Sequence, residues 1–546
     1  MRRLLPTVLF LTGFSLAQEP TAPPAAGRPA DPVPPAGMAQ IVKRDLLAHA
    51  TFLASDELGG RLTGSPGQEA AAKYIAREFE RLGLEPLGDE VDGKRGFFQY
   101  YGIKRTRVEP RTHVKIGDLE LRTGFAVLGG QPTDLELSGK VVFCGLGRVR
   151  GSQQDLAEGD RLDGAIAVVA FRGQRGSVDK PLSVEQKFGM SFGVFGRLGK
   201  TAREMANRGA SAVWFVQVDD RIGLSDVLNY LAAAPGKDVL APAFQGGDNS
   251  MGGMAQMLAN SSVPTLILSV PASQQVLGSL GIAVEDLRAF VESEGARPTA
   301  KADLTGALSL LVTHDDQARA SNVCAVLRGS DPALAGEAVI YSAHMDHVGS
   351  RIDGEVFNGA DDNASGSAGL LAIAKAFATG AERPRRSVVF LSVSGEELGL
   401  WGSAYYAENP TWPLDKLVAD INTDMIGRSG PESGAMEVTV TPSHKHGHFS
   451  TIVQDAARFG SVLGLTFSSG DKYYQRSDHY NFAKKGIPVV FFCNGEHEDY
   501  HQVTDHADKL DGDKMERIAR LAFWTGWSVA NGAERPRKLG RSERWF

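Results

Sequence analysis

Two adjacent glutamates, Glu396 and Glu397, occupy the position in this chain that most directly suggests chemistry. They follow the apolar run 388–391, which is typical of a buried strand, and α/β enzymes keep their reactive groups at strand ends. Neighbouring carboxylates at such an end can point in different directions, so one can bind a metal while the other transfers protons. The pair by itself leaves open which carboxylate has which role.

Other side chains that bind metals occur at or near the ends of further strand candidates. The strand candidates in this part of the chain are residues 338–343, 387–393, 417–421 and 487–492. The metal-binding side chains that accompany them are His344, Asp361, Asp362, Glu396, Glu397, Asp424 and His501. A set of one His, one Asp, one Glu, one Asp and one His suits zinc, and its size suggests two ions that share a carboxylate. Alternation along a strand puts Asp346 on the same side as His344, where it can orient that imidazole.

These groups require a parallel sheet to bring them together. From about residue 302 onward, strands alternate with helices, which predicts a mixed, mostly parallel α/β sheet covered by helices on both faces. The best helix candidate is residues 365–379, which the acidic, glycine-rich turn around Asp362 precedes. Near the N-terminus, Ser65, Pro66 and Gln68 predict the start of a helix that Gly83 ends.

The middle of the chain has a different texture. Short β-like runs at 141–143, 165–171, 212–218 and 265–270 alternate with glycine-rich loops and one helix at 200–208. The phrases at 200–213 and 263–269 resemble the protease-associated domain, a β-rich module inserted into exported peptidases. We therefore expect a peptidase domain split into residues 39–127 and 299–530, with an inserted unit at 128–298.

Composition limits the remaining possibilities. The chain has 546 residues and a formal net charge of -7, which argues against nucleic acid as a partner. Residues 1–17 predict a cleaved signal peptide and a secreted or periplasmic protein; an uncleaved anchor is the alternative, but the run is short and Pro6 interrupts it. Residues 18–38 predict a Pro/Ala-rich linker, and residues 531–546 a frayed basic tail. Cys324 and Cys493 are expected to be buried, and the odd count of three cysteines argues against a disulfide scaffold.

Five motifs together resemble the di-zinc exopeptidase family that includes aminopeptidase Y and glutamate carboxypeptidase. In order along the chain they are residues 344–346, 359–366, 396–399, 424–427 and 500–501. The resemblance covers roughly residues 41–125 and 300–530. It implies two Zn²⁺ ions per chain: Asp362 bridges them, His344 and Asp424 complete one site, and Glu397 and His501 complete the other. It also implies that Glu396 is the general base and that the Asp362–Asn363 peptide bond is cis.

Other residues keep alternative interpretations. Tyr500 either donates to the oxyanion or packs beside His501. Residues 477–479 are interpreted as a structural network, and residues 444–448, which contain three histidines, as a solvated loop. Arg428 and Arg476 lie near loops where a carboxypeptidase would need arginine.

The resulting prediction is an exported zinc aminopeptidase that acts on peptides. A carboxypeptidase or a single-zinc glutaminyl cyclase on the same fold is an alternative, as is a non-catalytic receptor like the transferrin receptor. The receptor alternative is weakened because no ligand position is lost, and the cyclase because both His344 and Asp424 are present. The oligomeric state and the side-chain preference cannot be derived from the sequence.

Overall fold

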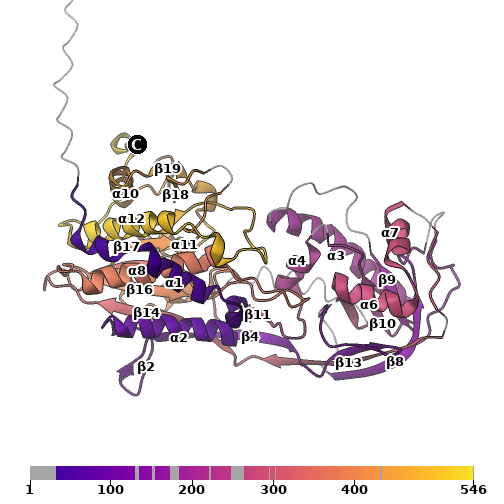
Figure 1. Ribbon diagram of the computed structural model, residues 1–546. Coiled ribbons are helices and arrows are strands. Elements are labelled where there is room, and N and C mark those ends of the chain that lie inside the picture. Colours follow the sequence, from indigo (N-terminus) through magenta and orange to yellow (C-terminus); the bar gives the residue numbers. More distant parts are fainter. Residues whose placement is uncertain are drawn as a thin grey trace, which may run out of the picture. The chain divides into compact units, whose positions relative to one another are not determined.

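The computed structural model describes residues 32–128, 134–149, 154–171, 184–220, 223–247, 263–293, 296–301, 303–430 and 433–544 (Figure 1). The predicted signal peptide and most of the predicted linker lie outside the described residues. The chain divides into the units Met1–Val33 and Pro34–Phe546, and the description below concerns the second.

The sheet that carries the candidate site has a parallel centre and antiparallel edges. β16 pairs in parallel with β15, β15 with β17, and β17 with β20, whereas β14 and β18 pair antiparallel with β16 and β20. In spatial order the strands are β4 (Phe98–Val108), β14 (Arg319–Leu327), β16 (Ser387–Val393), β15 (Ala338–His344), β17 (Leu417–Thr423), β20 (Val489–Cys493), β18 (Glu437–Thr441) and β19 (Thr466–Ser469). The predicted mixed α/β class is confirmed.

Helices cover both faces of this sheet because its central strands are apolar on both sides (Figure 1). Along β16, Val388 and Phe390 belong to one buried cluster, while Val389 and Leu391 belong to another, as the alternation of strand side chains requires. The first face is covered by α1 (Lys43–Leu53), α2 (Pro66–Arg81), α8 (Gly366–Thr379), α10 (Thr451–Val462) and α12 (Gly512–Asn531), and the second by α9 (Trp401–Glu408) and α11 (His479–Lys484).

The predicted start and end of α2 are confirmed. The Ser65 hydroxyl accepts a hydrogen bond from the Gln68 backbone N–H at 3.2 Å, and Pro66 is the first helical residue. Gly83 follows the helix with φ of 71°, a left-handed conformation that glycine adopts without strain.

The inserted segment contains a second sheet with its own helices. β8, β9, β10 and β12 pair in parallel in that order, and β7 pairs antiparallel with β12. The strands are β7 (Phe125–Val127), β8 (Asp134–Phe143), β9 (Ile166–Ala170), β10 (Ala212–Val216) and β12 (Thr265–Leu268). The helices are α3 (Val184–Asn207), α4 (Leu224–Leu231), α6 (Val270–Leu280) and α7 (Val284–Ser293). The four predicted strands are present, and the predicted helix at 200–208 forms most of the last two turns of α3.

Two long strands, β4 and β13, connect the sheet of the candidate site with the inserted segment. β13 (Thr305–Asp315) pairs with β8 over residues 305–311 and with β4 over residues 312–315. The core of the inserted segment includes Val114, which precedes the predicted boundary at 128, and Leu308, which follows the predicted boundary at 298. The predicted domain boundaries remain predictions, as does the likeness to a protease-associated domain.

The remaining elements are short. The strands are β1 (Glu85–Pro86), β2 (Glu90–Val91), β3 (Lys94–Arg95), β5 (His113–Ile116), β6 (Leu119–Leu121) and β11 (Val239–Pro242). The short helices are η1 (Ala36–Gln40), η2 (Asp56–Arg61), η3 (Ala360–Ser365), η4 (Leu414–Lys416), η5 (Asp471–Tyr473), η6 (Ala507–Lys509) and η7 (Arg541–Glu543).

The C-terminal segment is packed against the peptidase part, so the prediction of a frayed tail is wrong up to residue 544. Leu539 is buried in the cluster that covers the first face of the sheet. The Arg544 guanidinium donates to the backbone carbonyls of His444 and His446 and lies over the Phe449 ring. Arg544 therefore caps carbonyl groups of a loop, which net charge along the sequence does not reveal.

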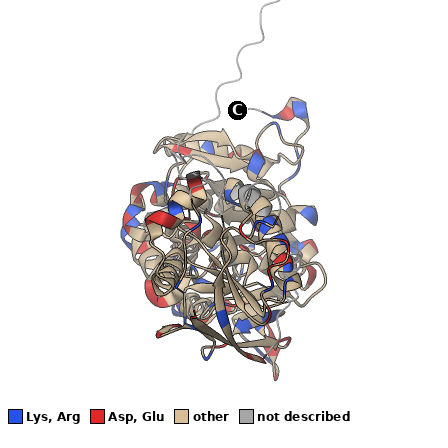
Figure 2. Cartoon of the chain, turned by 90° about the vertical axis from the view of Figure 1, so that its right-hand side faces the viewer, with Lys and Arg blue, Asp and Glu red and all other residues tan. Residues whose placement is uncertain are grey.

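Several predictions on composition can be compared with the described residues. Cys144, Cys324 and Cys493 are all buried and unpaired, as expected for the last two. No helix in the described residues is long and apolar enough to cross a membrane. Figure 2 shows positions of Lys and Arg interspersed with those of Asp and Glu on the face that it presents.

Candidate metal centre

The ends of four neighbouring strands bring the candidate ligands together. His344 is the last residue of β15, Glu396 and Glu397 follow β16, and Asp424 directly follows β17. His501 lies in the loop after β20. Because β15, β16, β17 and β20 are parallel, their carboxyl ends lie at one edge of the sheet.

A first group of ligand atoms surrounds His344. Its Nε2 lies 3.4 Å from Asp362 Oδ1 and 3.3 Å from Asp424 Oδ1. All three side chains are nearly or fully inaccessible to solvent. These are the three residues expected at one metal site.

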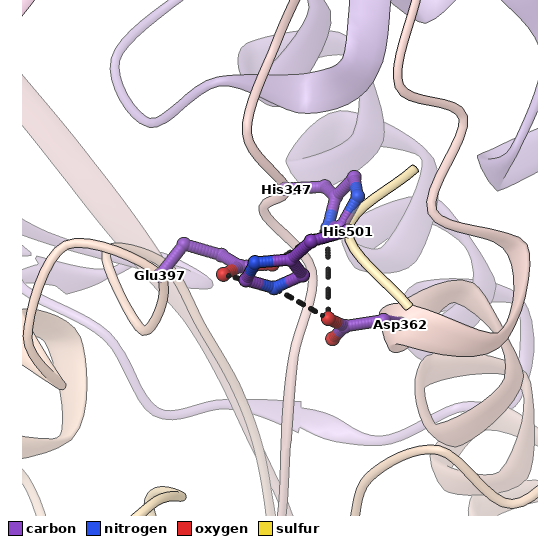
Figure 3. A group of neighbouring side chains, drawn as sticks. All are labelled: His347, Asp362, Glu397 and His501. Carbon is purple, nitrogen blue, oxygen red and sulfur yellow. Dashed lines mark hydrogen bonds and ion pairs between the residues drawn. The ribbon is translucent and has the colours of Figure 1, made fainter. Parts of the chain in front are cut away.

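A second group surrounds His501. Its Nε2 lies 2.9 Å from Asp362 Oδ2 and 2.9 Å from Glu397 Oε2, and Figure 3 shows the imidazole and both carboxylates pointing toward one another. Asp362 thus directs one oxygen to each group. This is the arrangement that a carboxylate bridging two ions requires.

The ligand atoms of both groups are better suited to binding metal ions than to bonding with one another. Within the described residues, the buried atoms His344 Nε2, His501 Nε2 and Asp424 Oδ1 make no contact with hydrogen-bond geometry, although ion-pair partners lie 2.9–3.4 Å away, and such atoms are costly unless another group binds them. Burial lowers the pKa of His501, but Glu397 and Asp362 outweigh it and raise the pKa to about 10. The carboxylates therefore favour positive charge here, and nitrogen with oxygen ligands suits zinc.

Glu396 and Glu397 differ in their surroundings. Burial raises the pKa of Glu396 well above its usual value, although His344 opposes the shift. Burial acts in the same direction on Glu397, but His501 and His347 outweigh it and hold its pKa well below the usual value. Glu396 Oε2 is also 3.9 Å from His344 Nε2, farther than the carboxylates of the first group. Neighbouring carboxylates whose pKa values are pushed apart are typical of a division between ligand and proton carrier.

His347 is a member of the cluster that the sequence analysis missed. Its Nδ1 lies 2.6 Å from Glu397 Oε1 and 4.0 Å from Asp362 Oδ2, and the side chain is fully buried (Figure 3). With Asp362, Glu397 and His501 it forms a group that could hold a metal ion. The available signal was its position next to the motif that ends in Asp346. It lies beyond the end of β15, so strand alternation does not predict its direction.

Asp346 supports the centre differently from the prediction. His344 Nδ1 lies 3.2 Å from the backbone carbonyl of Asp346 and 3.8 Å from its carboxylate, so the carbonyl is the nearer partner. The carboxylate instead accepts from the Thr63 hydroxyl at 2.9 Å and from the Glu396 backbone N–H at 3.3 Å. Burial raises the pKa of Asp346 to about 6. Asp346 therefore connects the His344 strand end to the backbone of Glu396.

The turn that carries Asp362 is tightly constrained. The Asp362–Asn363 peptide bond is cis, as predicted. Gly359 has φ of 56°, and a Cβ atom there would lie 2.5 Å from the His347 ring and 2.2 Å from the Asp362 carbonyl oxygen. Glycine is thus required where the turn passes the ligands. The Asp505 carboxylate accepts a hydrogen bond from the Asp362 backbone N–H at 3.2 Å and so helps to hold the turn.

A chain of hydrogen bonds orients the Asp424 carboxylate. The Ser477 hydroxyl donates to Asp424 Oδ2 at 2.8 Å and accepts from Asn422 Nδ2 at 2.7 Å. All three residues are buried. Residues 477–479 were predicted to form a structural network, and through Ser477 this network contacts a candidate ligand.

A cavity opens beside both groups of ligands. Its lining residues are Asp362, Glu396, Asp424, Met425, Tyr473, Arg476, Phe491, Cys493, Gly495, Glu496 and Tyr500. Arg476 is the basic member of this lining, and its Nη1 lies 2.6 Å from Glu496 Oε1. Arg428 instead forms an ion pair with Asp499. The wall of the cavity is therefore acidic and aromatic, with its arginine paired to a carboxylate.

Tyr500 and the histidine loop complete the comparison with the sequence analysis. The Tyr500 ring stacks on His501 with centroids 4.1 Å apart, and its hydroxyl lies 3.4 Å from Arg476 Nη2. The ring thus packs beside a ligand and also lines the cavity. Residues 444–448 form turns in which Lys445 and His448 are exposed. None of the three histidines in this loop joins a candidate metal group in the described part of the chain.

Comparison with known proteins identifies the segment that contains the centre. Residues 322–525 match peptidase family M28. The chain is 29% identical over 267 residues to a probable zinc metalloprotease of Pyricularia oryzae, an alignment that covers 40% of this chain and 51% of that protein. It is 31% identical over 233 residues to leupeptin-inactivating enzyme 1 of Streptomyces exfoliatus, with coverage of 42% and 48%. The chain therefore spans about half the length of these curated relatives.

Solved structures share the fold. A zinc aminopeptidase from Bacillus subtilis aligns with a TM-score of 0.52 at 17% identity, covering 92% of this chain and 98% of that one. A peptidase M28 precursor from Shewanella amazonensis aligns with a TM-score of 0.50 at 19% identity, covering 92% and 96%. The family resemblance inferred from the motifs is confirmed, and the likeness of the inserted segment to a protease-associated domain is not.

Proposed function

Because residues 322–525 match peptidase family M28, we propose that this chain is a zinc-dependent exopeptidase that acts on peptides. Within that class, we propose that it is an aminopeptidase. One observation carries the proposal. The carboxylate of Asp362 directs one oxygen toward the His344 group and the other toward the His501 group. Two ions at these positions, bridged by Asp362, account for the unpartnered ligand atoms around them.

We propose that each ion has three ligands from this chain. His344, Asp362 and Asp424 would hold one Zn²⁺, and Asp362, Glu397 and His501 the other, with His347 beside the second. Bound zinc would polarise the scissile carbonyl and lower the pKa of the attacking water. The chain's own residues would position the peptide and move the protons.

Glu396 is the proposed general base. It lines the cavity, and its raised pKa suits a group that takes a proton from water and returns it to the leaving amine. The ionised state of Glu397, favoured by two histidines, suits a ligand. Tyr500 would donate its phenolic hydrogen to the oxyanion from the same cavity wall.

The charge of the cavity supports recognition of an amino terminus. Its lining holds the carboxylates of Asp362, Glu396, Asp424 and Glu496 against the single guanidinium of Arg476. Glu496 pairs with Arg476 at 2.6 Å, so this arginine is occupied, whereas a carboxypeptidase needs a guanidinium free to bind the substrate carboxylate. Carboxypeptidase activity is the second candidate because Arg476 lies in the cavity at all.

The test is hydrolysis by the purified protein of a substrate panel with and without chelator and added zinc. Aminoacyl derivatives with a free amino group should be cleaved, and N-blocked peptides with a free carboxylate should not. Cleavage of the blocked peptides alone would replace the aminopeptidase assignment with a carboxypeptidase. Tightly bound zinc without any hydrolysis would favour a binding protein on this fold.

Export is part of the proposal and rests on residues 1–17 alone. Expression with and without these residues, followed by assay of the secreted and cell-bound fractions, tests it. We further propose that the inserted segment restricts access to small peptides. A panel of peptides of increasing length measures this restriction, and equal rates at all lengths would contradict it.

A further inference from the structure

The inserted segment reaches the metal centre through one side chain. Tyr230, in α4, places its hydroxyl 2.7 Å from Nδ1 of His501. The two rings are stacked with centroids 6.1 Å apart and an interplanar angle of 24°. The other nitrogen of the same imidazole, Nε2, faces Asp362 and Glu397. The imidazole thus lies between the candidate metal position and the inserted segment.

The position of the proton decides what this contact does. A histidine that binds an ion through Nε2 carries its hydrogen on Nδ1, and that N–H needs an acceptor. The Tyr230 oxygen is at hydrogen-bond distance and accepts it. The contact therefore gives the Nδ1 hydrogen of a metal-bound His501 its acceptor and fixes the direction of the ring. His344 satisfies the same requirement within its own loop, through the backbone carbonyl of Asp346.

The ammonium group of Lys187 links α4 to the loop that carries His501. The ammonium group of Lys187, in α3, lies 2.5 Å from Asp226 Oδ2 in α4 and 2.8 Å from Gln502 Oε1. The side chains of Lys187 and Asp226 are only 8% and 14% exposed, so this contact is shielded from solvent. Gln502 directly follows His501 in the chain. The helix that bears Tyr230 is thus fastened to the neighbour of the ligand that Tyr230 contacts.

A second contact fastens the inserted segment to the loop after His347. The buried ammonium group of Lys237 donates to the backbone carbonyl of Val348 at 3.1 Å. Arg351, in the same loop, lies 3.7 Å from Asp226 of α4. The α4 region therefore contacts both loops that present histidines to the second ligand group.

We propose that Tyr230 is a positioning residue for His501, and that the inserted segment is part of the metal centre. This inference rests on the proposed function, since it assumes that His501 binds zinc. It differs from a role in substrate access, because it predicts an effect on metal affinity when no peptide is present.

The matched variants are Tyr230→Phe and Tyr74→Phe. The Tyr74 hydroxyl lies 2.6 Å from Nδ1 of His49, between α1 and α2, so the control removes the same kind of contact from a histidine outside the centre. Zinc affinity is measured on the full chain by competition with a chromogenic chelator, without substrate. We expect Tyr230→Phe to lower the affinity for one of the two zinc ions by about 10–100-fold and to leave the affinity for the other unchanged. Tyr74→Phe should alter neither.

A double-variant cycle separates positioning from a general loss of structure. In a His501→Ala background, adding Tyr230→Phe should produce no further loss of zinc affinity, because the hydroxyl then has no imidazole to orient. Thermal unfolding of the metal-free proteins measures the structural effect of each change on its own. Wild-type zinc affinity in Tyr230→Phe, or an equal loss in both backgrounds, would overturn the inference. Because zinc is measured without substrate, a protein that binds zinc but cleaves no peptide would contradict the proposed function and leave this inference standing.

Discussion

Replacing each of the two adjacent glutamates by glutamine should produce opposite defects. Glutamine keeps the size of the side chain and removes its charge and its ability to take up a proton. Glu397 lies 2.9 Å from His501 Nε2, whereas Glu396 lies 3.9 Å from His344 Nε2. We therefore expect Glu396→Gln to retain zinc and lose turnover, and Glu397→Gln to lose zinc.

The expected sizes follow from these roles. Removal of a general base costs about 10²–10⁴-fold in kcat, which corresponds to roughly 3–5 kcal/mol of barrier. Glu397→Gln removes a negative charge from beside His347 and His501, at 2.6 and 2.9 Å. Since loss of an outer partner of a ligand costs about 10–100-fold in metal affinity, loss of the ligand charge itself should exceed that range.

The assay combines two measurements on each variant. Bound zinc is determined by atomic emission after desalting, and hydrolysis of an aminoacyl substrate is followed across a range of zinc concentrations. Added zinc should restore activity to Glu397→Gln and should not restore it to Glu396→Gln. The reverse pattern, with Glu396→Gln depleted of zinc and rescued by it, would show that the two roles are exchanged.

Three further predictions concern stability and metal. Removal of zinc by a chelator should abolish hydrolysis and lower the thermal midpoint, because zinc at 1,000 times its Kd stabilises the folded state by about 4 kcal/mol; an unchanged midpoint would argue against metal binding. Ser477→Ala should lower the free energy of unfolding by about 2 kcal/mol in denaturant titrations, because it leaves buried Asp424 without its hydroxyl donor, and a loss below about 0.5 kcal/mol would contradict the network. Burial lowers the pKa of His479 to about 3, so the unfolded chain binds a proton below about pH 6.5 that the folded chain does not. Stability should thus fall by about 2 kcal/mol between pH 8 and pH 5 through this group, a loss that His479→Phe should remove; equal pH dependence in both proteins would refute it.

The candidate ligands could be predicted because their positions follow local rules. His344, Glu397 and Asp424 each lie at or just beyond the end of an apolar strand, and parallel strands bring such ends to one edge. The start of α2 at Pro66 was predictable for the same reason, since Ser65 caps the helix with a bond three residues away. These features depend on short stretches of sequence.

The residues that sequence analysis missed depend on contacts between distant segments. Tyr230 meets His501 across 271 positions, and no local pattern connects an amphipathic helix to a loop so far along the chain. His347 lies beyond the end of β15, and its ring packs closely against the distant turn at Gly359. The packing of Leu539 and Arg544 was missed because a basic composition does not identify the carbonyl groups that the arginine meets.

The long strand β4 also bears on the synthesis of the chain, because one of its partner strands lies far along the sequence. Phe98 in β4 pairs with Val323 in β14, so the edge of β4 lacks this partner until the whole inserted segment has been made. At ~5–20 residues per second, the roughly 200 residues between them take on the order of 10–40 s to synthesise. During that interval β4 presents unpaired backbone groups, which makes it a site where nascent chains can associate. A chaperone that binds extended segments should therefore protect this strand during synthesis.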